Sequence, residues 1–338
     1  MALPLAPPLD PMLSKSQPEI PSGDGWIYEP KWDGFRAIVF RDGPEVHIAS
    51  RDHKPLERYF PELPEALRKA LPARCIVDGE VVIAGEKGLD FDVLLQRIHP
   101  AESRIRKLAA ETPASFVAFD ILALASKDLT STPIEKRRAA LEKILGAGGT
   151  TADLGPGTQV IITPQTDDFD TASQWFVGFE DLGLDGIVAK RAGSPYTPGD
   201  RTMVKVKHLR DADCVVGGYR LSKTGDGVGS LLLGLYSDDG VLHYVGHTSS
   251  FKAPERRALL EQLRELEGGQ SFGEGRTPGG PSRWSAGRDT SWVSVDPVLV
   301  CEVAYERLQS GRFRHSARFL HWRPDKPPAE CTFDQLES

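Results

Sequence analysis

The sequence has few of the features that mark secreted, membrane-spanning or disulfide-linked proteins. Its 338 residues contain only four cysteines, and these form no C-x-x-C pair: Cys75, Cys214, Cys301 and Cys331. Zinc ribbons, thioredoxin-type motifs and disulfide frameworks are therefore disfavoured, and the spacing fits a reducing compartment. No apolar run approaches roughly 18 residues, and no cationic segment with an apolar core opens the chain. We expect a cytoplasmic protein that does not cross a membrane.

Positive charge is also in short supply, because 41 lysines and arginines face 48 aspartates and glutamates, which gives a net charge of −7. A histone-like or purely electrostatic nucleic-acid binder is therefore disfavoured, and any nucleic-acid partner has to be held by local basic patches. The rest of the composition, 40% hydrophobic and 26% charged, is that of a globular protein, and the length predicts two domains.

Several common site motifs are missing. No Gly-Lys dipeptide occurs, so the chain has no P-loop. Residues 225–229 read GDGVG without a following helix, which predicts a hairpin tip rather than a dinucleotide fingerprint. His243 and His247 are four residues apart in a predicted strand with no third ligand nearby, so a metal site there is disfavoured.

We expect an α+β domain over residues 1–208, because strand-like and helix-like segments alternate along it. Prolines crowd the first thirty residues, so the chain up to about Ile20 should run as an extended surface strap. Asp42-Gly43 between two apolar runs predicts a hairpin. Further strands are expected over residues 75–83, 115–122, 159–162, 186–190 and 202–207, and helices around residues 63–70, 134–145 and 170–182.

Residues 209–338 predict five short strands and one helix, which is the inventory of an OB-type barrel. The strands are expected over residues 214–221, 229–236, 242–247, 298–305 and 319–323, and the helix contains Leu259, Leu260, Leu263 and Leu266. Between the helix and the fourth strand, residues 268–291 form a glycine-rich loop longer than a compact domain normally holds. We expect this loop to be functional, or disordered when nothing is bound.

The most informative segment is residues 29–36, EPKWDGFR, where Lys31 lies between a rigid proline and an Asp-Gly turn. A lysine beside a turn is usually a solvated surface residue, so this pattern alone is weak. Its companions strengthen it, because charged residues recur in or beside apolar strands downstream. They lie at residues 50–51 (SR), 77–81 (VDGEV), 117–121 (VAFDI), 184–190 (LDGIVAK) and 203–207 (MVKVK).

Lys205 and Lys207 are two residues apart in a predicted strand and therefore share one face of it. Two ammonium groups that point the same way need an anion between them. Phosphate is the obvious candidate.

This ordered set resembles the covalent nucleotidyltransferase superfamily of DNA ligases, RNA ligases and mRNA capping enzymes. Within it, the sequence is most similar to bacterial ATP-dependent DNA ligases of the ligase C type and to the ligase module of ligase D. The resemblance runs from about Pro11 to Lys326. It implies an ATP-grasp-like nucleotidyltransferase domain over residues 1–208, followed by an OB-fold β-barrel over residues 209–338.

The resemblance also implies a reaction. In this family a lysine attacks the α-phosphate of ATP, carries AMP as a phosphoramide and passes it to a 5′-phosphate, and AMP leaves when a 3′-OH attacks. Lys31 matches the nucleophile. A free lysine, with a pKa of about 10.4, is almost always protonated, so the site has to lower the pKa of this amine. Lys205, Lys207 and a divalent cation are expected to do so by repulsion.

The other roles are carried over residue by residue. Phe119 matches the aromatic that stacks on adenine, and Glu29 the residue whose backbone meets the base edge. Glu80 matches a ribose-binding carboxylate that also lies near the metal, expected to be Mg²⁺ or Mn²⁺. Asp185 departs from the glutamate that most relatives carry, and we retain it as a second metal ligand. Arg36 and Arg51 match arginines that reach the sugar and phosphate. Lys205 and Lys207 match the two lysines that contact the α-phosphate.

The C-terminal domain carries a basic strip, residues 307–326, with six basic residues, one acidic residue and interleaved aromatics. Such a mixture suits a phosphate backbone. Arg323 and Lys326 match the family's last motif, which orients the pyrophosphate leaving group. We therefore expect a monomer that acts on nicked or broken duplex DNA in repair or end joining, with a hinge near residues 208–211.

Two alternatives remain open at the level of sequence. One is an RNA ligase or a capping-type nucleotidyltransferase, which shares the motifs and would be distinguished by labelling with α-labelled ATP against GTP. The other is a non-catalytic nucleic-acid-binding module that keeps the fold. Lys31, Glu80, Lys205 and Lys207 argue against it, because a pure binder has no need for this lysine cluster.

Overall fold

The computed structural model describes residues 3–86, 88–146, 148–149, 153–154, 157–269, 271–273, 278, 291–309 and 311–336. The chain divides into two units, Met1–His208 and Leu209–Ser338, and each is treated on its own. Most of the glycine-rich loop expected at residues 268–291 lies outside the described residues. None of the described helices is long and apolar enough to span a membrane.

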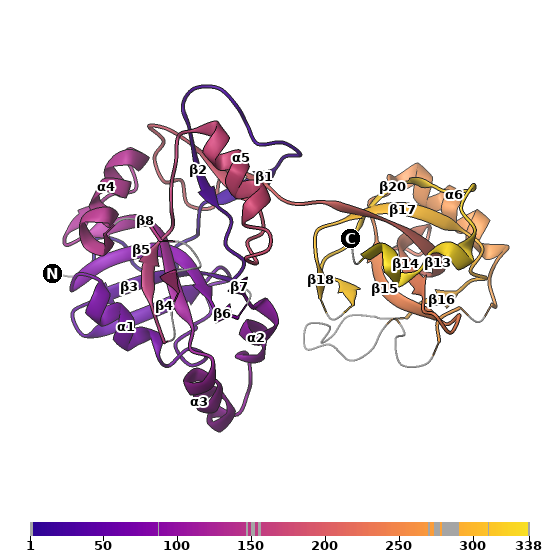
Figure 1. Cartoon of the computed structure of the whole chain (residues 1–338), viewed down its shortest axis with the longest axis horizontal. Coiled ribbons are helices and arrows are strands. Elements are labelled where there is room, and N and C mark those ends of the chain that lie inside the picture. Colours follow the sequence, from indigo (N-terminus) through magenta and orange to yellow (C-terminus); the bar gives the residue numbers. More distant parts are fainter. Residues whose placement is uncertain are drawn as a thin grey trace. The chain divides into compact units, whose positions relative to one another are not determined.

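A six-stranded sheet forms the larger half of the first unit (Figure 1). Its hydrogen-bonded order is β10-β8-β5-β3-β4, with β9 added to β8. The hairpin predicted at Asp42-Gly43 is confirmed, and Gly43 has a φ of 63°, the left-handed region that suits glycine. The strands are β3 (Phe35–Asp42), β4 (Glu45–Ser50), β5 (Arg74–Val82), β8 (Ser115–Leu124), β9 (Lys127–Asp128) and β10 (Val160–Ile162).

A second sheet of four strands has the order β1-β12-β11-β2. These are β1 (Leu13–Ser16), β2 (Trp26–Pro30), β11 (Ile187–Arg191) and β12 (Arg201–Val206). The expectation of a surface strap without strands up to about Ile20 is wrong for β1, which pairs in parallel with β12. No proline interrupts residues 12–17, so their N–H groups are free to join a sheet.

Three helices cover the outer faces of these sheets. On the six-stranded sheet, α1 (Leu63–Ala70) and α4 (Ile134–Leu145) bury Leu63, Leu67 and Leu141. On the four-stranded sheet, α5 (Phe169–Gly178) buries Ala172 against β2 and β11. All three were predicted from their periodicity, but α5 ends at Gly178, before the Leu182 that the prediction included. The first unit also contains α2 (Phe91–Gln96), α3 (Glu102–Glu111) and a small hairpin of β6 (Ala84–Gly85) and β7 (Gly88–Leu89).

The inner faces of the two sheets share one apolar core. Ile38, Phe40 and Ile76 from the six-stranded sheet pack in the same cluster as Met203 from β12 and Met12 just before β1. Side chains on opposite faces of a strand alternate, so the same strands that bury helices outside can meet inside. The two sheets therefore face each other, and any cavity between them is lined from both.

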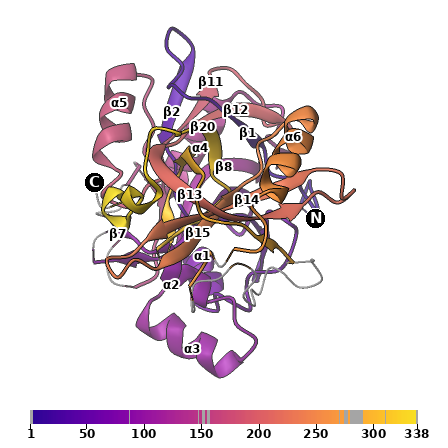
Figure 2. The same ribbon diagram turned by 90° about the vertical axis from the view of Figure 1, so that its right-hand side faces the viewer.

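The second unit is a barrel built on the order β15-β14-β13-β17-β20 (Figure 1). A bridge between Thr248 and Ala317 joins the end of β15 to the start of β20 and closes the barrel. The strands β13, β14 and β15 lie side by side in both views (Figure 2). They are β13 (Arg210–Leu221), β14 (Val228–Tyr236), β15 (Leu242–Thr248), β17 (Val300–Tyr305) and β20 (Arg318–Trp322).

Smaller elements complete this unit. Helix α6 (Ala253–Arg264) buries three of the four leucines that predicted it, Leu259, Leu260 and Leu263. The rest are β16 (Val293–Ser294), β18 (Leu308–Gln309), β19 (Arg312–Phe313) and the 3₁₀ turns η2 (Pro328–Glu330) and η3 (Phe333–Leu336). Three of the four cysteines belong to this unit, and all four are free and buried.

Candidate active site

A cavity of about 100 Å³ lies between the two sheets of the first unit. The six-stranded sheet contributes Arg36, Glu80 and Phe119. The four-stranded sheet and its flanks contribute Ser14, Glu29, Pro30, Lys31, Trp32, Val188, Lys190 and Met203. Five of the residues expected at the site from sequence therefore line one cavity, although they come from four strands and span about ninety positions.

Lys31 follows directly after β2, and its backbone is fixed by the segment that carries Asp185. Its N–H donates to the carbonyl of Gly186 at 2.8 Å, and its carbonyl accepts from the N–H of Asp185 at 2.8 Å. Gly186 has a φ of 127°, and a Cβ there would lie 2.0 Å from the carbonyl oxygen of Val206. Only glycine fits this close approach, so the Asp-Gly pair holds Lys31 in place.

The carboxylate of Asp185 lies between two ammonium groups. Its Oδ2 is 2.8 Å from Nζ of Lys31 and 2.9 Å from Nζ of Lys207. Burial alone would raise the pKa of Asp185, but the charges and hydrogen bonds of Lys31 and Lys207 outweigh it and hold this pKa well below its usual range. The two lysines expected to repel each other are thus joined by a shared carboxylate.

Lys205 and Lys207 differ in their positions relative to β12. Lys207 lies just beyond the last residue of the strand and reaches Asp185. Lys205 lies within the strand, opposite Val188, and shares its face with Met203, which lines the cavity.

Glu29 is clamped by two side chains that were not predicted as site residues. Its Oε2 is 2.7 Å from Nζ of Lys190, and its Oε1 accepts from Nε2 of Gln165 at 2.8 Å. Glu29 and Lys190 are each only 3% exposed, so they form a buried ion pair at the wall of the cavity. The sequence signal for this ion pair was Lys190 itself, a lysine that follows three apolar residues in a predicted strand.

Arg36 lines the cavity and lies between the ring of Phe119 and the buried carboxylate of Asp78. Its guanidinium carbon is 4.3 Å from the centre of the Phe119 ring. Its Nε and Nη2 donate to the two carboxylate oxygens of Asp78, each at 2.6 Å. Burial would lower the pKa of Arg36, and Asp78 more than offsets this and raises it, so the guanidinium stays charged.

Glu80 is the register partner of Arg36 on the neighbouring strand and lines the cavity. Burial raises the pKa of Glu80 to about 7, although Arg36 and Lys31 act to lower it. A cation bound at this carboxylate would compensate the same burial. Near neutral pH the Glu80 carboxyl is therefore poised between its charged and neutral forms.

Arg51 does not join this group. It lies in the turn after β4, is exposed, and is absent from the lining of the cavity.

Arg323 and Lys326 belong to the second unit and lie at a separate cavity of about 360 Å³, which also touches Trp322. Arg323 is held by two carboxylates. Its Nη1 lies 3.0 Å and 3.1 Å from the oxygens of Asp213, and its Nη2 donates to Asp325 at 2.9 Å. Lys326 lies 3.3 Å from Glu330. Both cations are therefore partnered by acids of their own unit.

The expected metal ligands do not form a cage made of protein alone. Within the described part of the chain, no three histidine, cysteine, aspartate or glutamate side chains are grouped to hold a metal ion. Mg²⁺ commonly binds through one or two carboxylates together with phosphate oxygens and water. Asp185 beside Lys31 and Glu80 in the cavity fit that pattern.

Similarity to known proteins identifies the family of this chain. A family model described as the ATP-dependent DNA ligase domain matches residues 11–207, and one for the ATP-dependent DNA ligase C-terminal region matches residues 224–326. The chain is 50% identical to DNA ligase C of Mycobacterium tuberculosis over 351 residues, covering 100% of this chain and 96% of that protein. This chain belongs to the ATP-dependent DNA ligases.

The ligase is also 31% identical to the multifunctional non-homologous end joining protein LigD of Mycobacterium bovis, over 90% of this chain and 37% of that protein. A Lig E DNA ligase of known structure has the same fold, with a TM-score of 0.53 at 18% identity over 92% of this chain and 99% of that one. The resemblance to ligase C and ligase D is confirmed, as is the nucleotidyltransferase domain followed by an OB-fold region.

Replacing Glu80 by glutamine should stabilise the ligase, and more so at high pH. The pKa of Glu80 is about 7 in the folded chain against 4.5 as the ordinary value, so its contribution to stability is full below pH 4.5 and is lost as the pH rises through 7. The excess free energy of unfolding of Glu80→Gln over wild type should be about 2 kcal/mol larger at pH 8 than at pH 5. Urea denaturation at both pH values without nucleotide measures this difference in the free energy of unfolding. A difference that does not change with pH would contradict the raised pKa of Glu80.

Proposed function

We propose that this ligase seals breaks between a 3′-OH and a 5′-phosphate in duplex DNA through a lysine–AMP intermediate. Lys31 Nζ forms a bond to the α-phosphorus of ATP, and the bond to the β-phosphate oxygen breaks to release pyrophosphate. The AMP is next transferred to the 5′-phosphate, which regenerates the lysine. Attack by the 3′-OH on that phosphate then forms the phosphodiester and releases AMP.

One observation carries this proposal. Lys31 lines the cavity and shares the carboxylate of Asp185 with Lys207. Both its backbone N–H and its backbone carbonyl are hydrogen-bonded to the Asp185-Gly186 segment. A nucleophile must be held rigidly beside the groups that receive the developing charge. Lys207, with Lys205 two residues earlier in β12, would supply positive charge for the α-phosphate.

The cavity supports a role in holding the nucleotide. Phe119 offers an aromatic face for adenine, and the backbone of Glu29 runs along the wall where the base edge would lie. Arg36 and Glu80 line the same cavity and are proposed to bind the ribose and phosphate. Arg51 is proposed to reach the phosphates from its exposed turn, which requires the side chain to extend toward the cavity.

Mg²⁺ or Mn²⁺ is proposed as the metal, with Asp185 and Glu80 as its protein ligands. The bound cation would supply charge neutralisation at the phosphates. A cation bound at Asp185 would take the place of a lysine partner and keep this largely buried carboxylate paired.

Arg323 and Lys326 are proposed to orient the β- and γ-phosphates during the first step only. Their cavity in the second unit has a volume of about 360 Å³, which leaves room for phosphate groups, and both side chains are positively charged. Their role would end when pyrophosphate leaves.

The basic strip of residues 307–326 is proposed to contact the DNA backbone. Arg312 and Arg314 lie on and beside β19, within a protein of net charge −7. We further propose that the enzyme acts in repair or end joining as a cytoplasmic monomer, and that it binds nicks weakly.

Lys31→Ala should abolish the labelled adduct formed with α-labelled ATP and Mg²⁺ or Mn²⁺, because only this amine forms the covalent bond. Lys127→Ala, at an exposed lysine of β9, serves as the control and should label like the wild type. Labelling is read on a denaturing gel. A persistent adduct in the Lys31 variant would exclude this lysine as the nucleophile.

DNA affinity should fall by more than about tenfold between 50 and 200 mM salt, because a few arginine–phosphate contacts release counterions. Arg312→Ala and Arg314→Ala should each reduce the slope of log affinity against log salt by about one. Arg257→Ala, on the exposed face of α6, should leave the slope unchanged. Fluorescence anisotropy with a nicked duplex measures this, and a flat profile would rule out the strip as the DNA contact.

Arg323→Ala and Lys326→Ala should slow lysine adenylylation by about 10²-fold, a typical loss for one charge-stabilising donor. Sealing of a chemically pre-adenylated nick should proceed near the parental rate, because that step involves no pyrophosphate. If both activities fell in equal proportion, the two residues would be structural or DNA-binding.

A further inference from the structure

Tyr196 is a buried tyrosine whose hydroxyl joins three segments of the first unit. It is 3% exposed and lies between β11 and β12. Its Oη accepts from the N–H of Met12 at 3.0 Å and donates to Oδ2 of Asp78 at 2.6 Å. The hydroxyl therefore links the segment that leads into β1 to a carboxylate in the middle of β5.

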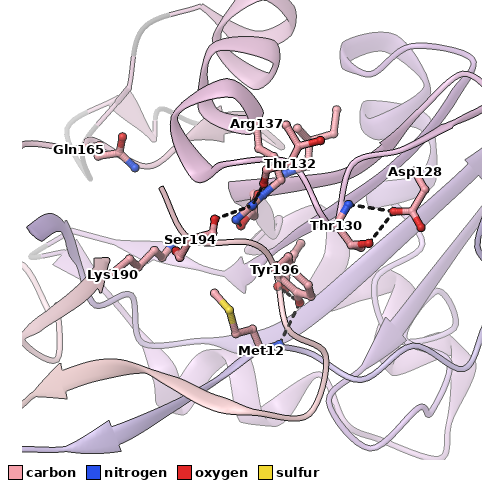
Figure 3. A network of polar contacts seen from close by, with 12 residues as sticks. Met12, Asp128, Thr130, Thr132, Arg137, Gln165, Lys190, Ser194 and Tyr196 are labelled. Atoms are coloured by element: carbon pink, nitrogen blue, oxygen red, sulfur yellow. Dashed lines mark hydrogen bonds and ion pairs between the residues drawn. The ribbon is translucent and has the colours of Figure 1, made fainter. Parts of the chain in front are cut away.

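The loop that carries Tyr196 is itself held firmly (Figure 3). The N–H of Tyr196 donates to the carbonyl of Thr130 at 2.7 Å, and Arg137 donates to the carbonyl of Ser194 at 3.1 Å. Arg137 is wholly buried and pairs with Asp120 at 2.7 Å. With its backbone and its neighbours fixed, the tyrosine ring has little freedom to move its hydroxyl.

Asp78, the acceptor of that hydroxyl, is completely buried and has a second partner. Both of its oxygens accept from Arg36 at 2.6 Å, so Oδ2 is shared between Arg36 and Tyr196. Arg36 in turn lies 4.3 Å from the centre of the Phe119 ring and lines the cavity. A continuous set of short contacts thus runs from Tyr196 through Asp78 and Arg36 to the aromatic ring.

Two features indicate that this arrangement serves the cavity rather than the core alone. Arg36 keeps about a fifth of its side chain exposed, whereas Asp78 has none. The Asp78 carboxylate could accept the two hydrogen bonds of Arg36 in more than one orientation. The additional hydrogen bond from Tyr196 to Oδ2 favours one of these orientations. The carbonyl of Met12 also receives a weak contact from Nη2 of Arg36 at 3.4 Å, so the segment bound by Tyr196 touches the same guanidinium.

We propose that Tyr196 is a positioning residue for nucleotide binding: its hydroxyl orients Asp78, and through Asp78 it fixes the Arg36 guanidinium beside Phe119. This inference rests on the proposed function, because it assigns the cavity to the nucleotide. Tyr196 does not touch the nucleotide itself. Its loss should weaken ATP binding while the chemistry at Lys31 continues.

Tyr196→Phe removes one oxygen atom and keeps the ring. In the exchange of labelled pyrophosphate into ATP without DNA, lysine adenylylation and its reversal turn over repeatedly. In this assay the variant should raise the KM for ATP about tenfold and leave kcat within about twofold of wild type, the pattern of lost ground-state binding. Tyr28→Phe is the matched control, because Tyr28 is also buried and its hydroxyl donates to the carbonyl of Pro21 at 2.8 Å. It should leave the KM unchanged.

A double-mutant cycle distinguishes positioning from a merely structural role. In an Arg36→Ala background, Tyr196→Phe should raise the KM for ATP by less than about twofold, because the group that it positions is already gone. An equal tenfold effect in both backgrounds would overturn the proposal. Asp78→Asn breaks the same link from the carboxylate side and should also raise the KM selectively, so it provides the test if Tyr196→Phe does not fold.

The outcomes also separate this proposal from the proposed function. If the wild type forms no adduct with ATP and Mg²⁺ or Mn²⁺, the proposed function fails. If the wild type is adenylylated but folded Tyr196→Phe and Asp78→Asn have the KM of wild type, or lose kcat instead, only the positioning role is wrong.

Discussion

The geometry of this site depends on one carboxylate held between two cations. Asp185 binds the ammonium groups of Lys31 and Lys207 within 2.9 Å, and its own backbone, with that of Gly186, fixes the backbone of Lys31. Three charges of a partly buried site are thereby paired, as the interior of a protein requires. Two ammonium groups and one carboxylate leave an excess of positive charge, and under the proposed function an arriving triphosphate would take over part of the pairing that Asp185 provides.

The same arrangement, a cation held by acidic side chains, recurs around the cavity of the first unit and in the second unit. Glu29 is paired with Lys190, and Arg36 with Asp78. Arg323 is held by Asp213 and an exposed neighbour on its own loop. In each case the cation is kept in a defined position by acids of the same unit. Fixed donors are what electrostatic stabilisation of a phosphoryl-transfer transition state needs, because their orientation costs little at the moment of reaction.

Much of the fold and the proposed nucleophile could be predicted from sequence, because these features are local. The Asp42-Gly43 hairpin and the period of α4 are set by adjacent residues, and the KxDG pattern marks Lys31. The α2 and α3 helices were missed because α2 has only six residues and α3 buries a single residue, Ile105, so neither has a clear apolar face. The partners Gln165, Lys190 and Tyr196 were missed because their contacts span long stretches of chain, 118 positions for Tyr196 and Asp78, and no local pattern records such a pairing.

The account depends most on which lysine carries AMP, since Lys31 and Lys207 lie at the same carboxylate and Lys205 is only two residues before Lys207, in β12. Wild-type protein incubated with ATP and Mg²⁺ or Mn²⁺, then digested and mapped by tandem mass spectrometry under conditions that preserve phosphoramides, answers this directly. The account predicts a single adenylyl group on the peptide that contains Lys31, removed by added pyrophosphate. An adenylyl group on Lys205 or Lys207, or none on any lysine, would contradict it.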